Sequence, residues 1–271
     1  MDEGHSSTTG RRGAAGRREA TERRDAVGAV GARQVRQPVH DARRALASTG
    51  ACLLEPPAVA QCLGVDEAVW GAFAAHWEEL APDAYAARSG TRRLRRYGHL
   101  CLSREGTIDA KPHDAFVQPQ ESNPLYVDVD RHFEPLTDAF MGEPVLAALI
   151  RMLGQVAVCL EDADAWDVKV HPFRVVAETG SEGQPTPEGR HRDGVTLVTS
   201  LLIDRVNATG GESTVYAPDG TELTSTTLDT PGTLLLNDDR ATLHGVSPIH
   251  PLDAARPARR DVLVTTLAPR G

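Results

Sequence analysis

Residues 187–203 read PEGRHRDGVTLVTSLLI, a polar, glycine-containing segment that leads directly into an apolar run rich in Val, Thr, Leu and Ile. This composition favours a β-strand over a helix. Similar runs recur along the second half of the chain, separated by Gly, Pro, Asn and Asp, which are the residues of turns. We expect strands at residues 166–177, 195–203, 213–217, 221–227, 232–236, 242–249 and 261–267.

The close spacing of these short runs is typical of an antiparallel sandwich or barrel. The first half of the chain shows helical periodicity instead. The sequence therefore predicts a mainly β fold with flanking helices and a jelly-roll core. In the first half we expect helices at residues 41–48, 64–80 and 143–160, and strands at residues 51–54 and 92–103.

Composition also predicts the domain organisation. Residues 1–37 are mostly small or charged and offer almost nothing to bury, so we expect a disordered N-terminal extension. The remaining residues, 38–271, are enough for one domain with a full core. Within that domain we expect a helical N-terminal part at residues 38–160 and the jelly-roll core at residues 165–268.

The charge distribution and the apolar runs exclude several classes of protein. The net charge is −9, with +3 on residues 1–40 and −12 on the rest. An acidic body is a poor partner for nucleic acid, because such binding depends on neutralising phosphates. The apolar runs are too short to cross a bilayer, and no signal peptide is visible. We therefore expect a cytoplasmic protein with a small-molecule partner, no nucleic acid and no membrane, and we leave a homodimer open.

The cysteines give no sign of a metal site or a disulfide framework. The four residues, Cys52, Cys62, Cys101 and Cys159, form no CxxC pair and show no regular spacing. Structural zinc sites and disulfide-rich scaffolds both require such spacing. We expect buried free thiols in a reducing compartment.

A different set of residues predicts a metal centre. His191 and Asp193 form an HxD pair just before the run at residues 195–203. In an extended segment, residues i and i+2 share one face, so both side chains can reach one ion. His244 lies in a later β run, ATLHGVSPI, which a jelly roll can place beside the pair. Two His and one carboxylate form the facial set that binds non-haem Fe(II).

Arg260 is a candidate for holding a carboxylate near this centre. It begins the last β run, RDVLVTTL, sixteen residues after His244. A guanidinium beside a metal is a natural bidentate partner for a carboxylate. The spacing alone leaves a second interpretation open, in which Arg260 is an exposed charge at a strand edge.

The order of these motifs resembles a known family. The stretches WDVKVHPFRVVAE, PTPEGRHRDGVTLVTSLLIDRVNATGGESTVY, LLLNDDRATLHGVSPI and RRDVLVTTL resemble the iron(II)/2-oxoglutarate dioxygenases that include bacterial free L-amino-acid hydroxylases of the isoleucine dioxygenase type. The resemblance extends more weakly to RRYGHLCLS and FVQPQESNPLYVDVDRHFEPL, so that it covers residues 90–268. It implies a double-stranded β-helix, which agrees with the predicted strands.

The resemblance also implies the roles of the site residues. His191, Asp193 and His244 correspond to the iron ligands, and Arg260 corresponds to the anchor of the 2-oxoglutarate C5-carboxylate. Fe(II), 2-oxoglutarate and O₂ are then required, and succinate and CO₂ are formed. Related halogenases lack a carboxylate at the position of Asp193 so that halide can bind iron. Its presence here favours hydroxylation or another oxidative outcome over halogenation.

The substrate implied by the resemblance is small and polar, and a free L-amino acid fits best. Such a substrate needs a cation for its carboxylate and an acceptor for its ammonium group. Arg96, Tyr97, Gln118 and Asn123 lie in the two upstream stretches that we expect to cover the barrel mouth. Arg174, in the strand before the HxD pair, either faces the pocket or lines the barrel elsewhere.

Three alternatives remain from the sequence. The same oxygenase chemistry could act on a pathway intermediate, by hydroxylation, desaturation or cyclisation. A cupin-like metal enzyme that uses no 2-oxoglutarate would make Arg260 dispensable. A non-catalytic cupin-like binding protein would keep the fold without turnover, although the complete set of His191, Asp193, His244 and Arg260 argues against a decayed site.

One further motif concerns the backbone. Gly210 and Gly211 predict a tight turn or bulge where two backbone segments approach closely. We expect the side chain of Asn207 to satisfy the backbone of that turn.

Overall fold

The structure is a computed structural model that describes residues 1, 37–88, 90–114, 116 and 131–270. Among these residues, nine strands form one large sheet with the order β1-β11-β7-β14-β6-β3-β2, and β4 and β5 join it through β6. Every strand pair in it is antiparallel. Its strands are β1 (Ala51–Leu54), β2 (Ala81–Pro82), β3 (Arg92–Arg95), β4 (Gly98–Ser103), β5 (Ile108–Ala110), β6 (Ala165–Ala177), β7 (Leu197–Val206), β11 (Leu234–Asp238) and β14 (Ala258–Pro269).

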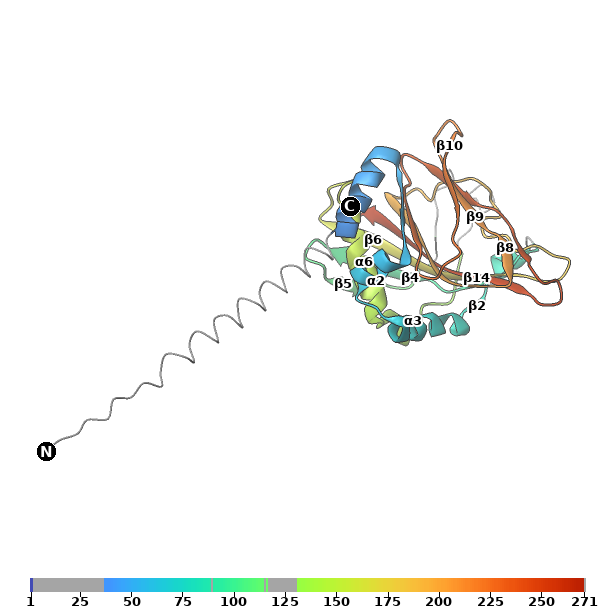
Figure 1. Ribbon diagram of the computed structural model, residues 1–271, viewed down its shortest axis with the longest axis horizontal. Coiled ribbons are helices and arrows are strands. Elements are labelled where there is room, and N and C mark those ends of the chain that lie inside the picture. The colour runs from blue at the N-terminus through green and yellow to red at the C-terminus, as the bar shows by residue number, and fades with distance from the viewer. Residues whose placement is uncertain (2–36, 89, 115, 117–130, 271) are drawn as a thin grey trace.

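Two smaller antiparallel sheets complete the barrel. One has the order β10-β9-β12, and the other pairs β13 with β8. The large sheet takes strands from distant parts of the chain, while the strands between them in sequence form the smaller sheets (Figure 1). This is the jelly-roll arrangement that the sequence predicts. The added strands are β8 (Ala208–Gly210), β9 (Glu212–Tyr216), β10 (Glu222–Thr227), β12 (Leu243–Val246) and β13 (Ile249–Pro251).

Helices cover one face of the large sheet (Figure 1). Residues 37–49 are helical and precede β1. No described helix is both long and apolar enough to cross a membrane. The other helices are α2 (Pro56–Leu63), α3 (Glu67–Ala74), the 3₁₀ helix η1 (Ala75–Glu79), α4 (Ala84–Arg88), α5 (Asp138–Met141) and α6 (Pro144–Ala157).

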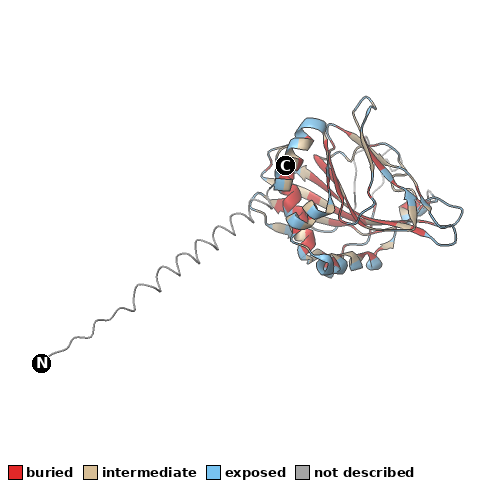
Figure 2. Cartoon of the chain, viewed as in Figure 1, coloured by how far each residue is buried: buried red, intermediate tan, exposed pale blue. Residues whose placement is uncertain are grey.

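The alternation of β6 separates the apolar core from a cavity. Trp166, Val168 and Val170 are almost fully buried in the core that the helices cover. The intervening Lys169 and His171 face the other way and line the cavity between the sheets. Buried residues accordingly follow the long strands and the inner side of the helices (Figure 2).

Two predicted elements are divided in the structure. The helix expected at residues 64–80 begins only at Glu67, where the Asp66 side chain accepts a hydrogen bond from the Val69 amide, and it tightens into η1 at Ala75. The strand expected at residues 92–103 is interrupted after Arg95 and resumes as β4. The predictions were therefore right in location and wrong in continuity.

The part expected to be helical also contributes to the large sheet. β1 pairs with β11, and β3 and β4 pair with β6. Residues 2–36, which make up nearly all of the expected N-terminal extension, lie outside the described residues. The division into an extension and a single domain remains a prediction.

The glycine pair allows a close backbone approach, as predicted. Gly210 and Gly211 have φ angles of 70° and 68°, and a Cβ on Gly210 would lie 2.2 Å from the carbonyl oxygen of Pro248. The prediction for Asn207 was wrong. Its Nδ2 donates to backbone carbonyls at residues 253 and 256, at 3.0 and 2.8 Å, so it fastens the loop before β14.

Candidate active site

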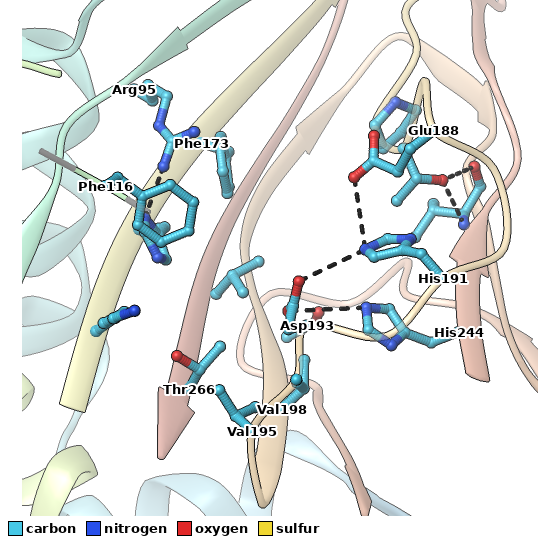
Figure 3. Close-up of a pocket in the computed structure, with 18 of the residues that line it drawn as sticks. Arg95, Phe116, Phe173, Glu188, His191, Asp193, Val195, Val198, His244 and Thr266 are labelled. Carbon is cyan, nitrogen blue, oxygen red and sulfur yellow. Dashed lines mark hydrogen bonds and ion pairs between the residues drawn. The ribbon is translucent and has the colours of Figure 1, made fainter. Parts of the chain in front are cut away.

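Two backbone hydrogen bonds bring the predicted metal ligands together. His191 and His244 form an isolated antiparallel bridge in which each amide donates to the other's carbonyl at 2.9 Å. The centroids of their rings lie 4.4 Å apart. The Asp193 carboxylate lies 3.6 Å from Nε2 of His191 and 3.9 Å from Nε2 of His244 (Figure 3). One donor atom from each residue lies within 4.8 Å of the others.

Neighbouring groups orient both imidazoles. Nδ1 of His191 lies 2.9 Å from the Gly189 carbonyl, to which it donates, so Nε2 keeps its lone pair for the centre. Nδ1 of His244 lies 3.6 Å from a carboxylate oxygen of Asp239, and its Nε2 faces Asp193. A metal-binding histidine typically has a partner for its second nitrogen. The contact of His191 has hydrogen-bond length, whereas Asp239 faces Nδ1 of His244 at a longer distance.

Asp239 lies beside the predicted ligands, and the sequence reasoning missed it. It is 1% exposed, and it accepts hydrogen bonds from the backbone amides of Asp193, Gly194 and Val195 at 3.1, 2.7 and 3.0 Å. Burial raises the pKa of Asp239 to about 6, although the amide of Val195 lowers it. This carboxylate therefore fixes the backbone that carries Asp193 while facing the ring of His244.

The acidic neighbours of His191 favour positive charge at this centre. Burial alone lowers the pKa of His191, but Asp193 and Glu188 outweigh burial and raise that pKa to about 9. Burial lowers the pKa of His244 to about 4. Nδ1 of His244 is buried without a hydrogen-bond partner among the described residues. Two imidazole nitrogens and one carboxylate on one face form the donor set that non-haem Fe(II) prefers.

A cavity of about 470 Å³ opens beside this centre. Its volume lies within the range of about 300–1,000 Å³ that is usual for small-molecule sites. Figure 3 shows Arg95, Phe116 and Phe173 across the cavity from His191 and His244. The wall on that side is cationic and aromatic, with Arg95, Phe116, Arg131, Lys169, His171 and Phe173.

Arg260 is buried near the start of β14. It is 4% exposed, which excludes the alternative of an exposed strand-edge charge. Its register partner on β6, Val175, lines the cavity, although Arg260 itself is not among the lining residues. Nη2 lies 3.5 Å from Oγ of Ser213, and Nε is buried without a hydrogen-bond partner among the described residues. A Cβ on Gly211 would lie 3.3 Å from Cδ of Arg260, so this glycine leaves room for the side chain.

Two predicted substrate contacts lie elsewhere. Arg96 donates to the carbonyls of Glu79 and Pro135, both at 2.7 Å, and does not line the cavity. Arg174 donates to Asp261 at 2.8 and 2.7 Å. It faces the helices because its strand neighbours at 173 and 175 face the cavity. We therefore assign structural roles to Arg96 and Arg174.

The other predicted substrate contacts have different outcomes. Tyr97 is 3% exposed and stacks on His171 with a centroid distance of 5.1 Å, so it supports the cavity wall from behind. Burial raises the pKa of Tyr97 to about 12. Gln118 and Asn123 lie outside the described residues.

The sequence reasoning also missed the cationic wall. Its signal was present in WDVKVHPF, where apolar residues alternate with Asp, Lys, His and Phe over residues 166–173. The alternating polar positions of a strand in a covered sheet face an interior cavity. Arg95 had no such local signal, because its position beside His171 depends on the pairing of β3 with β6.

Comparison with known proteins gives one family. The family model described as 2OG-Fe dioxygenase matches residues 74–266. A curated relative from Pantoea ananatis (strain AJ13355), named 3(1)-hydroxy-L-isoleucine 4-dioxygenase, is 24% identical over 195 residues, which is 70% of this chain and 77% of the relative.

Solved structures agree with this match. The crystal structure of a bsmA homolog from Methylobium petroleophilum PM1 matches with a TM-score of 0.79 at 36% sequence identity. The match covers 86% of this chain and 94% of the bsmA homolog. The crystal structure of IDO from Bacillus thuringiensis has a TM-score of 0.69 at 17% identity, over 88% and 96% of the two chains. At 17% identity, the similarity to IDO shows a shared fold and nothing further.

Proposed function

Because this chain belongs to the 2OG-Fe dioxygenase family, whose members use Fe(II), 2-oxoglutarate and O₂, we propose that it hydroxylates a C–H bond of a free L-amino acid. The observation that carries the proposal is the convergence of His191, Asp193 and His244 beside a cavity. Asp193 supplies the carboxylate that a halogenating site would lack.

The chain's own residues have separate tasks in this proposal. His191 and His244 each present Nε2, and Asp193 adds a carboxylate oxygen, so that the three side chains hold Fe(II). When bound, iron with 2-oxoglutarate and O₂ supplies the oxidising power for a C–H bond, and 2-oxoglutarate is converted to succinate and CO₂. Asp239 positions the ligands through the 193–195 backbone and the ring of His244.

Arg260 is proposed to hold the distal carboxylate of 2-oxoglutarate. Burial lowers the pKa of its guanidinium to about 10, which still leaves it charged near neutral pH. A buried guanidinium whose Nε lacks a described partner is costly until an anion pairs with it. The hydroxyl of Ser213 is within reach of the same carboxylate.

Two observations support an amino-acid substrate. The relative from Pantoea ananatis is named for a reaction on a hydroxy-L-isoleucine. The cavity also offers charges of both signs, since cations on the β3 and β6 wall face Glu188 beside His191. We further propose that residues 38–271 act as one catalytic domain, since β1 and β3 belong to the same sheet as β6 and β14.

The test is a product screen. Protein loaded with Fe(II) without oxygen is mixed with 2-oxoglutarate and one L-amino acid at a time, and succinate and product mass are measured after O₂ is admitted. We expect one or a few amino acids to stimulate succinate formation and to gain one oxygen atom. A product lighter by two hydrogens would replace hydroxylation by desaturation. No stimulation by any amino acid, with iron and 2-oxoglutarate bound, would refute the amino-acid substrate.

A further inference from the structure

The cavity wall that faces the metal centre contains cations that the proposed iron and 2-oxoglutarate sites do not use. We infer that Arg95 and Lys169 form a carboxylate subsite that binds the substrate and directs its C–H bond toward His191, Asp193 and His244. The inference rests on the proposed function for the identity of the substrate, but the subsite can be tested separately.

Arg95 is held rigidly before any ligand arrives. Its side chain is almost fully buried, and its guanidinium carbon lies 3.5 Å from the ring centre of Phe133 and 4.5 Å from that of Phe173. Its Nη2 lies 2.7 Å from Nδ1 of His171. Nε is buried without a hydrogen-bond partner among the described residues. A guanidinium fixed in this way loses little entropy when it binds a carboxylate.

His171 contributes a neutral donor to the same wall. Because the guanidinium of Arg95 has only donors, Nδ1 of His171 must accept the hydrogen bond, and the proton of the neutral ring is on Nε2. Burial, followed by the charges of Arg95 and Lys169, holds the pKa of His171 well below its usual value. The ring therefore adds a hydrogen-bond donor and no further positive charge.

Lys169 is the second charged member of the subsite. It lies on the cavity face of β6, two residues before His171, and its Nζ is 5.2 Å from the ring centre of Phe116. No described residue forms a hydrogen bond or an ion pair with its ammonium group, although Asp167 and Asp193 act on it electrostatically. Burial lowers the pKa of Lys169. Because Lys169 and Asp193 line the same cavity, this ammonium can hold an anion that lies in the cavity with the metal centre.

Neighbouring acids on this wall are already paired. The carboxylate of Asp83 is fully buried and lies 2.9 Å from Nε of Arg93, whereas it is 4.0 Å from the nearest nitrogen of Arg95. Asp167 lies 2.7 Å from His99. Among the described residues, Arg95 shares the single carboxylate of Asp83 with Arg93, and Arg131 lines the same wall, so Arg95 and Lys169 add to a surplus of positive charge facing the cavity. Buried charges are costly unless they are paired, so a substrate carboxylate stabilises this wall.

The carboxylate could come from the substrate or from 2-oxoglutarate, and the structure favours the substrate. Arg260 is a separate buried cation at the start of β14, and Ser213 lies beside it. It gives 2-oxoglutarate a partner of its own. The subsite instead lies on β3 and β6, and Figure 3 shows Arg95 across the cavity from the histidines.

The lysine content makes a direct test practical. Lys111 and Lys169 are the only lysines in the chain, so protein labelled with ¹³Cε-lysine gives two lysine resonances, and Lys111→Arg assigns them. The full chain is loaded with Zn(II) in place of Fe(II) and saturated with 2-oxoglutarate. It is then titrated with free L-amino acids, with their amides and with acetate.

We expect an amino acid to shift the Lys169 resonance saturably, its amide to bind at least about tenfold more weakly, and Lys111 to remain unchanged. A shift of Lys169 caused by 2-oxoglutarate alone would assign the subsite to the co-substrate and overturn the inference. If amino acids bind or react while the Lys169 resonance stays fixed, the subsite is refuted and the proposed function stands. If acetate shifts Lys169 but no amino acid binds, the proposed function fails and the carboxylate subsite stands. No shift with any carboxylate refutes the inference.

A pair of variants separates binding from a structural effect. Lys169→Met keeps the length of the side chain and removes the charge, and it should weaken amino-acid binding roughly 10- to 100-fold, the usual effect of losing a charge-assisted hydrogen bond. Lys169→Arg should retain most of the affinity. In Lys169→Met the difference between acid and amide should shrink towards zero. If that difference persists unchanged, Lys169 does not contact the carboxylate.

Discussion

The loss of Asp239 should weaken the metal site and the fold together. Its carboxylate accepts three backbone amides from residues 193–195, and it lies 3.6 Å from Nδ1 of His244. A hydrogen bond to a charged group contributes about 1.5–3 kcal/mol, and a buried amide left without a partner costs about 1–3 kcal/mol. Burial of the carboxylate opposes this gain, as its raised pKa shows.

For Asp239→Ala we expect the free energy of unfolding to fall by about 3 kcal/mol, because water replaces some of the lost hydrogen bonds. Asp239→Asn should cost about 1–2 kcal/mol, since the amide oxygen can still accept from part of the 193–195 backbone. The affinity for a divalent metal should fall about 10- to 100-fold in both variants, as is usual when a partner of a ligating histidine is removed.

The assay combines guanidinium unfolding of the metal-free protein with competition between the protein and a chelator for Zn(II). Asp219→Asn is the matched control, because Asp219 also accepts a backbone amide, that of Thr221, but from an exposed turn. It should change neither quantity. Wild-type metal affinity in Asp239→Ala would refute the positioning role, even if stability fell.

Three further predictions follow from the same contacts. Arg260→Met should raise the KM for 2-oxoglutarate about 10- to 100-fold, because a charge-assisted pair is lost; an unchanged KM in steady-state kinetics would favour a metal enzyme without this co-substrate. Arg174→Met should lower the free energy of unfolding by about 3 kcal/mol, since the Asp261 side chain is 1% exposed and loses its shorter ion pair, leaving only Arg259 at 3.9 Å. The KM values of Arg174→Met should equal those of the wild type. A raised KM for the substrate would show that Arg174 contacts the substrate after all. Burial raises the pKa of Asp83, but Arg93 and Arg95 outweigh burial and lower it. The Asp83 carboxylate therefore makes its full contribution to the free energy of unfolding above its ordinary pKa of about 3.9. This contribution is lost as the pH falls through the lower pKa of the folded protein. Asp83→Asn should be less stable at neutral pH and lose less stability on acidification, and equal acid sensitivity in an unfolding series would contradict this.

The local features of the site could be predicted from sequence. The spacing of His191 and Asp193 before a β run places both side chains on one face whatever the rest of the fold does. The start of a β run at Arg260 likewise suggests a cation beside the metal centre. These features depend on strand alternation, which is readable over a few residues.

The orientation of Arg174 could not be predicted in the same way. Between residues 173 and 176 both faces of β6 are covered, and the sequence FRVV shows no clear alternation. In such a run the pattern of apolar and polar residues does not indicate which side chains face the cavity. Only the pairing with β3 and β14 decides it.

Contacts between distant segments were also beyond the sequence. Arg95 and His171 are 76 residues apart, and Asp239 reaches amides 44–46 residues before it. Each contact depends on how strands cross between sheets, and no local motif marks it. The break of the predicted helix at Ala75 has a similar origin, because Trp77 turns inward and donates to the carbonyl of Phe173 on β6 at 3.0 Å.

The most direct test of the metal centre compares the wild type with His244→Ala. Both proteins are loaded with Fe(II) without oxygen, supplied with 2-oxoglutarate and the amino acid that stimulates the wild type best, and assayed for succinate after O₂ is admitted. Guanidinium unfolding establishes that the variant is folded. We predict that the wild type forms succinate in step with hydroxylated product and that folded His244→Ala forms neither above background. Equal succinate formation by both proteins would contradict the assignment of iron to His191, Asp193 and His244.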